Sequence, residues 1–152
     1  LIDHVVDVVV VNERLDAAVD IALLASYSSD ISLDKKYSSL PVMKGKPEEI
    51  QQIFINIIAN AVQAMHGKGK LTLASETRGE NIMVRIQDTG PGIPQEYLKK
   101  IFDPFFTTKD QGEGTGLGLN IVHRIVEKYG GKINVETEMG KGTSFIIQLP
   151  LN

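Results

Sequence analysis

The chain has 152 residues, a net charge of −3, 42% hydrophobic and 23% charged residues, and no cysteine. This length predicts one domain with its own core. No apolar run approaches the ~18 residues of a membrane-spanning helix. The lack of cysteine excludes disulfides and thiolate metal sites and fits a reducing compartment. The negative charge argues against nucleic-acid binding, which usually needs a basic stripe. No secretory signal is visible at its start. Because the chain does not start with methionine, we expect a fragment of a longer protein.

The first quarter of the chain predicts short strands around one helix. The expected elements are a strand over Asp7–Val11, a helix from Asn12 to about Ala25, and strands over Ile31–Tyr37 and Pro41–Lys44. Asn12 is the expected N-cap, and Glu13 follows at the positive end of the helix dipole.

The clearest helix runs from Pro47 to Met65. Proline and two glutamates form a favourable first turn. Apolar side chains then recur at three- and four-residue spacing and form one stripe. They are Ile50, Ile53, Phe54, Ile57, Ile58, Ala61 and Met65.

The rest of the chain predicts two strand pairs separated by a loop and a helix. The expected ranges are strands Leu71–Glu76 and Ile82–Gln87, a short helix Gln95–Lys100, a helix Leu117–Tyr129 before Gly130-Gly131, and strands Ile133–Glu138 and Thr143–Leu149. Strands that alternate apolar with polar residues predict a sheet covered on one face. We therefore expect a two-layer α/β sandwich with a mixed, mostly antiparallel sheet and about three helices on one face.

Asp88 is the first candidate for chemistry. It continues the phase of Ile82, Val84 and Ile86, so its carboxylate is expected to face the helices, where it needs hydrogen bonds. One interpretation is that it only opens the turn that follows. The other is that it accepts a hydrogen bond from an amino group such as that of adenine, while Gly90 and Gly92 let a flat ring approach.

Two asparagines, Asn56 and Asn60, lie on one flank of the Pro47–Met65 helix. Asparagine is unfavourable inside a helix, so a pair of them calls for a reason. Either both side chains face water, or Asn60 offers its amide oxygen to a hard cation such as Mg²⁺.

A glycine-rich segment, Gly112–Leu119, leads directly into the next helix. A helix N-terminus preceded by glycines is a ready phosphate site, although the same segment alone also fits a flexible linker. It is neither a Walker A loop nor a Rossmann turn. Before it lie three phenylalanines, which either anchor the loop in the core or serve a site, and Lys109, which is well placed to meet a phosphate.

Taken together, these motifs are more specific than any one of them. Asn60-Ala61, Asp88-x-Gly-x-Gly, Phe-x-Pro-Phe-Phe-Thr-Thr-Lys and Gly-x-Gly-Leu-Gly-Leu occur in a fixed order. This series resembles the ATP-binding catalytic domain of sensor histidine kinases, with the form seen in nitrogen-regulation sensor kinases. The resemblance covers about Pro47–Leu151. It implies the Bergerat fold that these domains share with gyrase, Hsp90 and MutL.

The resemblance also implies a role for each matching residue. Asn60 would bind Mg²⁺, Asn56 would lie beside the nucleotide, and Asp88 would specify adenine with Thr143 and a water. Lys109 would position phosphate. The remaining nucleotide contacts implied are Gly90, Gly92, Ile93, Phe102, Gly114, Thr115, Gly116, Leu117, Gly118 and Leu119.

Two departures from the pattern of the superfamily are informative. Its ATPases carry a glutamate at the position of Asn56, so slow ATP hydrolysis is expected here. Many relatives have a basic residue at the position of Gln63. Without it, Mg²⁺ and Lys109 would have to supply more of the positive charge that a polyanionic ligand needs. Two enzyme alternatives are an anti-sigma-factor serine kinase and a gyrase-like ATPase. An alternative of another class is a nucleotide-sensing docking module without turnover.

The resemblance finally implies how the domain is used. Residues 1–11 would end a linker and form the first strand, and residues 12–152 would form one catalytic domain with an ATP lid at about 89–116. The γ-phosphoryl group of ATP would pass to a histidine on a separate dimerisation domain and then to the receiver domain of a response regulator. The implied full-length protein is a homodimer. The domain itself would be cytoplasmic and touch neither membrane nor nucleic acid.

Overall fold

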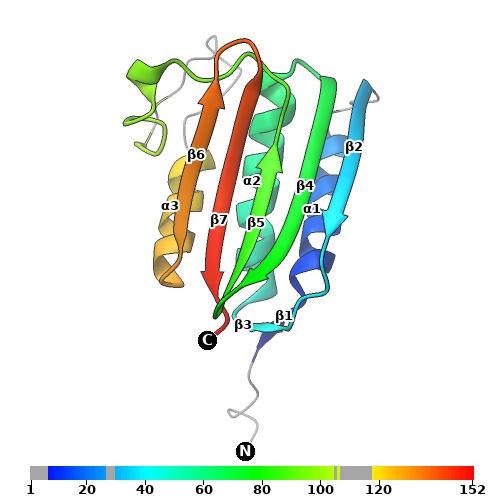
Figure 1. Ribbon diagram of the computed structural model, residues 1–152, viewed down its shortest axis with the longest axis vertical. Coiled ribbons are helices and arrows are strands. Elements are labelled where there is room, and N and C mark those ends of the chain that lie inside the picture. The colour runs from blue at the N-terminus through cyan, green and yellow to red at the C-terminus, as the bar shows by residue number, and fades with distance from the viewer. Residues whose placement is uncertain (1–6, 27–29, 105, 107–117) are drawn as a thin grey trace, which may run out of the picture.

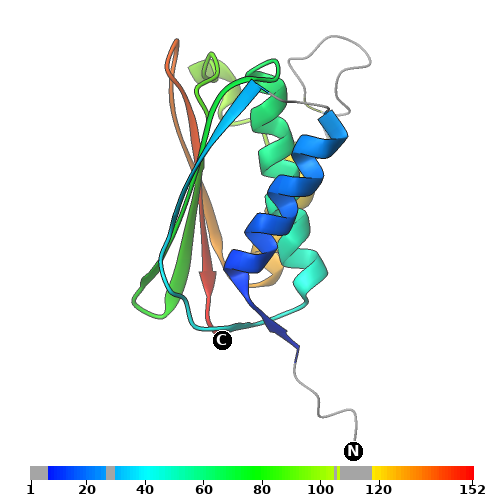
Figure 2. The ribbon, with the colours of Figure 1, turned by 90° about the vertical axis from the view of Figure 1, so that its right-hand side faces the viewer.

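A computed structural model describes residues 7–26, 30–104, 106 and 118–152. In this part of the chain three helices lie on one face of a five-stranded sheet (Figure 1). Figure 2 shows the two layers from the side, with the helices on one face of the sheet. The predicted two-layer sandwich is confirmed.

The sheet is mixed. Its strands are β2 (Asp30–Tyr37), β4 (Lys68–Arg78), β5 (Asn81–Gln87), β6 (Lys132–Glu138) and β7 (Gly142–Pro150), in the spatial order β2-β4-β5-β7-β6. Strands β2 and β4 are parallel, and the other neighbours are antiparallel. The strand order places the end of β5 and the start of β7 side by side, with Gln87 opposite Ser144.

Helix α2 (Pro47–Ala64) forms the centre of the helical layer, between α1 (Val11–Ser26) and α3 (Gly118–Lys128). Its apolar stripe is buried as predicted, and the buried members are Ile50, Ile53, Phe54, Ile57, Ile58, Ala61 and Val62. Each large apolar side chain that leaves water contributes about 1.5–3 kcal/mol. These residues pack toward Leu71, Leu73, Phe145 and other helix-facing strand residues in one core.

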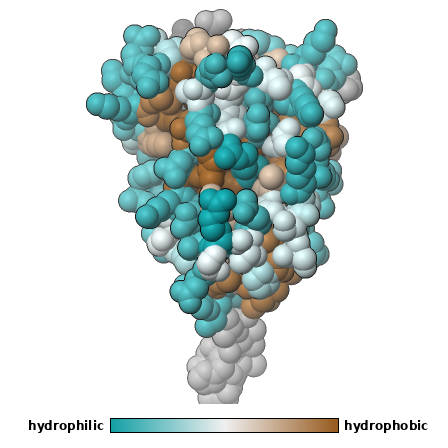
Figure 3. Space-filling model, viewed as in Figure 1, coloured by the Kyte–Doolittle hydropathy of each residue, from teal (hydrophilic) through white to brown (hydrophobic). Residues whose placement is uncertain are grey.

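The other face of the sheet has no helix over it in the described part of the chain. Figure 3 shows this face, where hydrophilic side chains surround a few hydrophobic patches. An ion pair of 3.0 Å joins Arg85 of β5 to Glu136 of β6 there. The alternation of apolar and polar residues that predicted a half-covered sheet is therefore confirmed.

The helix α1 differs from its prediction at its start. The helix begins at Val11, so Asn12 lies in the first turn and is not the N-cap. Its side chain instead donates to the Ser38 carbonyl at 2.9 Å and accepts from the Ser75 hydroxyl at 2.8 Å. The amide is used to tie the helix to the sheet, a long-range contact that local capping rules do not include.

Four further elements differ from their predicted bounds by more than one residue. Strand β1 covers only Val8–Val9, because its partner β3 has only two residues, Met43–Lys44. Strand β4 starts at Lys68, where its pairing with β2 begins. The predicted short helix is a 3-10 turn over Gln95–Tyr97, continued by backbone bonds of three-residue spacing.

The end of α3 is fixed to the start of α2 by Tyr129. Its hydroxyl donates to Glu49 at 2.6 Å and accepts from the Lys46 backbone at 2.9 Å, and Lys128 pairs with Glu49 at 2.6 Å. The hydrogen bond from Lys128, together with that from Tyr129, lowers the pKa of Glu49. Because Lys46 caps α2 without a side-chain hydrogen bond, the tyrosine supports an otherwise weak helix start.

We expect Tyr129→Phe to lower the free energy of unfolding by about 1–2 kcal/mol, because two hydrogen bonds are lost and the ring stays. Urea unfolding followed by circular dichroism measures this. The control is Tyr97→Phe, whose ring packs against Phe106 and whose hydroxyl makes no hydrogen bond within the described residues. Equal stability of the two variants would contradict the role of the Tyr129 hydroxyl.

Candidate functional site

At one end of the sheet, three neighbouring strands each carry a polar residue on the side that faces the helices. In β5 the helix-facing residues Ile82, Val84 and Ile86 are buried, and Asp88 follows in the same phase. Thr143 precedes Phe145 of β7 in the same way, and Thr137 follows Val135 of β6. Since side chains alternate between faces of a strand, all three polar groups point toward the helical layer.

Asp88 is held by the backbone on both sides. Its side chain is 3% exposed, and its Oδ1 accepts from the amides of Gly90 at 2.8 Å and Thr143 at 3.2 Å. Its own amide donates to the Thr143 carbonyl at 2.9 Å. The Asp88 side chain therefore makes the turn contact of the first interpretation, and it is buried as the phase of β5 predicted. Oδ2 takes part in neither of the two side-chain hydrogen bonds.

The environment of Asp88 changes the pKa of its carboxyl group. Burial disfavours the charged carboxylate and raises the pKa of Asp88, while the hydrogen bonds from Gly90 and Thr143 lower it; the net direction is upward. A buried carboxylate with a raised pKa at the edge of a core is a common mark of a functional site.

Two glycines let the backbone approach at this point. At Gly142, with φ +137°, an added Cβ would lie 2.1 Å from the Asp88 carbonyl oxygen. At Gly92, with φ +86°, it would lie 2.6 Å from the Glu138 carbonyl oxygen. Neither position accepts a side chain without movement of the backbone. The loop after Asp88 and the β6–β7 turn are thus packed against each other.

Thr137 is a site residue that the sequence analysis missed. Its hydroxyl accepts from the Ile93 amide at 2.8 Å and lies 2.9 Å from the hydroxyl of Thr143, which is 5% exposed. The signal was present in the sequence, because a threonine continues the apolar phase of Ile133 and Val135. Ile93, predicted as part of the site, is brought to it by this bond.

The two asparagines of α2 are half-buried, so neither simply faces water. Asn56 accepts from Gln52 at 2.6 Å and donates to the Gly118 carbonyl at 3.1 Å. Asn56 therefore ties the middle of α2 to the first residue of α3. Asn60 lies one turn further along the same flank.

The residues predicted for the lid and glycine loop are only partly described. Phe102 is half-buried against the core, its ring centroid lies 5.4 Å from that of His123, and its carbonyl accepts from Asn120 at 3.2 Å. Leu119 also packs against the core. Lys109, Gly114, Thr115, Gly116 and Leu117 lie outside the described residues.

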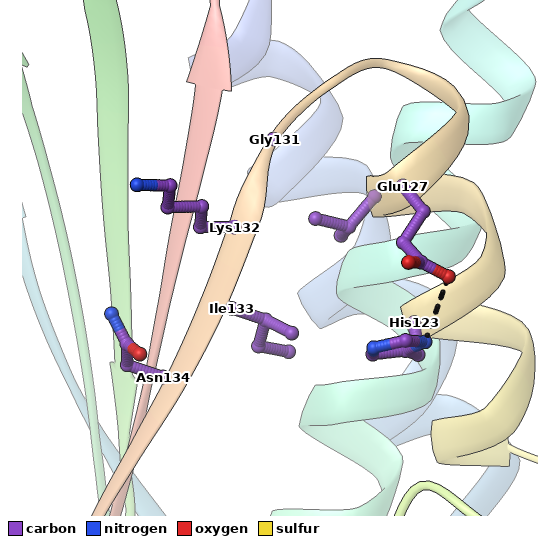
Figure 4. Close-up of a pocket in the computed structure, with 7 residues that line it drawn as sticks. His123, Glu127, Gly131, Lys132, Ile133 and Asn134 are labelled. Atoms are coloured by element: carbon purple, nitrogen blue, oxygen red, sulfur yellow. Dashed lines mark ion pairs between the residues drawn. The ribbon is translucent and has the colours of Figure 1, made fainter.

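A separate hollow of about 280 Å³ lies between α3 and β6 (Figure 4). Its polar side carries the ion pair of His123 and Glu127, at 3.2 Å, and Ile133 points toward it from β6. None of the residues predicted for the site lines this hollow. The chemistry of Asp88 and its neighbours, rather than the size of this hollow, locates the candidate site.

Comparison with known proteins identifies the family of the chain. Residues 45–152 match the family described as histidine kinase-, DNA gyrase B-, and HSP90-like ATPase. The chain belongs to this family. The catalytic domain of histidine kinase ThkA superposes on this ATPase-family domain with a TM-score of 0.84 at 32% identity, covering 97% of this chain and 96% of that one. The Bergerat fold implied by the motifs is therefore confirmed.

Curated relatives of the domain are sensor kinases. Sensor histidine kinase ZraS of Escherichia coli K12 is 40% identical over 114 residues, which is 75% of this chain and 24% of the relative. Sporulation kinase C of Bacillus subtilis is 38% identical over 125 residues, 81% of this chain and 29% of the relative. The domain is thus an ATP-binding catalytic domain of the histidine kinase type. It spans about a quarter of the length of these relatives.

Within the described residues, no helix is both long and apolar enough to cross a membrane. The closer match to nitrogen-regulation kinases that the lid motif suggested stays a prediction.

The raised pKa of Asp88 makes a prediction about pH. Because the folded chain binds this proton more tightly than the unfolded chain, the contribution of Asp88 to stability falls as pH rises from the unfolded pKa, near 3.8, through the raised folded pKa. We expect Asp88→Asn to remove this part of the pH dependence. Urea unfolding at a series of pH values measures it. Identical stability profiles for the two proteins would contradict the assignment.

Proposed function

We propose that this domain binds Mg·ATP and passes its γ-phosphoryl group to a histidine on a separate dimerisation domain, for relay to the receiver domain of a response regulator. The observation that carries the proposal is the buried Asp88 carboxylate, whose Oδ2 takes part in neither of its two side-chain hydrogen bonds within the described residues, beside Gly92 and Gly142, which accept no side chain without movement of the backbone. One structural relative, full-length ShkA, is described in complex with AMPPNP, with a TM-score of 0.83 at 28% identity, covering 95% of this chain and 31% of that one.

The described residues fit the purine end of ATP. Asp88 would accept a hydrogen bond from the adenine amino group, and Thr143 would support it from the neighbouring strand. Gly90 and Gly92 would border the ring, as the motif implies. An added Cβ would also crowd the protein itself, at 3.1 Å from the Asp88 carboxylate for Gly90 and 2.6 Å from the Glu138 carbonyl oxygen for Gly92. A hydrogen bond to an ionised carboxylate contributes about 1.5–3 kcal/mol.

The other end of ATP would lie toward α2 and α3. Asn60 would supply an amide oxygen to Mg²⁺, which is satisfied with one or two protein ligands plus phosphate oxygens. The described residues hold no group of three His, Cys, Asp or Glu that would form a metal site without phosphate. Lys109 and the N-terminal end of α3, with the residues Gly114, Thr115, Gly116, Leu117, Gly118 and Leu119, would face the phosphates.

Bound Mg²⁺ would neutralise the charge that builds up on the phosphates. The protein would contribute position and electrostatics, which is usual for phosphoryl transfer. Asn56 would lie beside the nucleotide and, because a neutral amide cannot accept a proton as a general base, it would leave water unactivated. The γ-phosphoryl group would then be kept for the histidine rather than lost to water.

We also propose the setting of this reaction. Residues 12–152 would act as one catalytic domain with a lid at about 89–116, reached through residues 1–11. Partners would be the dimerisation domain and the receiver domain, in a homodimeric full-length protein. The domain would be cytoplasmic, which the absence of cysteine supports, and it would contact neither membrane nor nucleic acid; the net charge of −3 supports the latter.

The proposal predicts that this domain alone binds ATP but does not label itself. Incubation with Mg²⁺ and [γ-³²P]ATP should leave it unlabelled and release phosphate slowly. Addition of the dimerisation domain of the same full-length protein, as a separate polypeptide, should give a labelled partner. The label should be acid-labile, as a phosphohistidine is.

The control is the same partner with its acceptor histidine changed to glutamine, which should stay unlabelled. An acid-stable label would instead favour the serine kinase alternative, and fast phosphate release would favour the ATPase alternative. ATP binding with neither label nor hydrolysis in any mixture would favour the docking module and contradict the proposal.

A further inference from the structure

Thr137 occupies the one polar position of β6 that faces the helices next to the candidate site. It lies directly opposite Thr143 in the β6–β7 ladder. Thr143 in turn donates its backbone amide to Asp88 at 3.2 Å. Thr137 therefore contacts Thr143, and Thr143 contacts the Asp88 carboxylate.

The hydrogen bonds around Thr137 limit where its proton can go. Its oxygen accepts from the Ile93 amide at 2.8 Å. Its hydroxyl donates to the Gly142 carbonyl at 3.2 Å, a group that can only accept. A threonine hydroxyl has one proton to give. In the 2.9 Å contact between the two hydroxyls, Thr143 is then the donor.

This assignment decides what Thr143 presents to a ligand. Because the Thr143 hydroxyl donates its proton to Thr137, it can only accept a hydrogen bond from a ligand. The neighbouring Asp88 carboxylate also only accepts. Two adjacent acceptors can receive hydrogen bonds from an amino group of a ligand. They disfavour a carbonyl group, since a buried acceptor that faces another acceptor stays unsatisfied. Adenine carries an amino group at position 6 of the purine, and guanine carries a carbonyl.

We propose that Thr137 is a positioning residue that fixes the hydroxyl proton of Thr143 and so sharpens the discrimination of an amino purine from an oxo purine. The inference rests on the proposed function, because it concerns the same nucleotide site. Asp88 reads the amino group, and Thr137 prevents Thr143 from turning into a donor for the carbonyl.

The test is the ratio of Kd for GTP to Kd for ATP, measured by calorimetry on the domain with Mg²⁺. Thr137→Val keeps the shape and removes the hydroxyl, which frees the Thr143 proton. We expect the ratio to fall about tenfold, the equivalent of about one hydrogen bond. Thr137→Ser, which keeps a hydroxyl, should restore the wild-type ratio. Thr77→Val, at an exposed position of β4, is the control.

The ratio separates positioning from a merely structural effect. Loss of the Ile93 contact alone would weaken ATP and GTP equally and leave the ratio unchanged, which would overturn the role of Thr137. Thr137→Ala lacks the same hydroxyl and decides the question if the valine variant does not fold. A wild-type domain without preference for ATP would overturn the adenine site itself, together with this inference.

Discussion

Asp88→Asn should weaken ATP binding about ten- to a hundredfold, the equivalent of about 1.5–3 kcal/mol. The variant has the shape of the native residue, and its amide oxygen can still accept from the Gly90 amide, so the turn should survive. The NH₂ group of the asparagine, however, replaces Oδ2. It would face the amino group of adenine, and two donors cannot form a hydrogen bond with each other. The preference for ATP over GTP should therefore be lost as well.

Calorimetric titration of both nucleotides measures this effect. Asp30→Asn is the matched control, because it makes the same chemical change at an exposed residue at the start of edge strand β2. Circular dichroism and urea unfolding show whether each variant keeps the fold. A folded Asp88→Asn domain with unchanged affinity for ATP would place the purine elsewhere.

The second large effect concerns Gly142. Gly142→Ala should destabilise the domain by about 2–6 kcal/mol, because it adds both backbone strain and a clash in a packed region. The φ of +137° disfavours any side chain, and the added Cβ would lie 2.1 Å from the Asp88 carbonyl oxygen. The strand end that carries Asp88 would have to move, so ATP affinity should fall in the protein that remains folded.

Gly140→Ala separates the two causes. Gly140 lies two residues earlier in the same turn and has φ +82°, but an added Cβ there would meet no atom within 4 Å. It should cost about 1–2 kcal/mol through backbone strain alone. Urea unfolding of both variants gives the difference. If both lose the same stability, close packing against Asp88 is not what requires glycine at position 142.

Local rules predicted the parts of the fold that local physics determines. The helix α2 was placed to within one residue, because its proline start and apolar stripe are readable along the chain. The glycine end of α3 was predicted equally well, and the Gly131 amide closes it on the Val126 carbonyl at 2.9 Å. The burial of Asp88 followed from the phase of β5.

Contacts between distant residues were not predictable in the same way. The parallel pairing of β2 with β4 depends on the register of two strands separated by helix α2. Tyr129 supports Lys46 across 83 residues of sequence. Asn12 has the right residue type for a cap but binds Ser38 and Ser75 instead. In each case tertiary contacts decide what a side chain does, and no local pattern contains them.

The motifs predicted only some of the residues that lie together at the candidate site. Asp88, Gly92 and Thr143 lie together as expected, and Ile93 joins them through Thr137, which the motifs do not include. The alternation along β6 indicates that Thr137 faces the helices, but only the β6–β7 register places it against Thr143.

A crystal structure of this domain with Mg²⁺ and a non-hydrolysable ATP analogue tests the central claim most directly. We predict that the exocyclic amino nitrogen of adenine lies about 3 Å from a carboxylate oxygen of Asp88, a hydrogen-bond distance. Adenine bound away from Asp88, for example in the hollow between α3 and β6, would contradict the account.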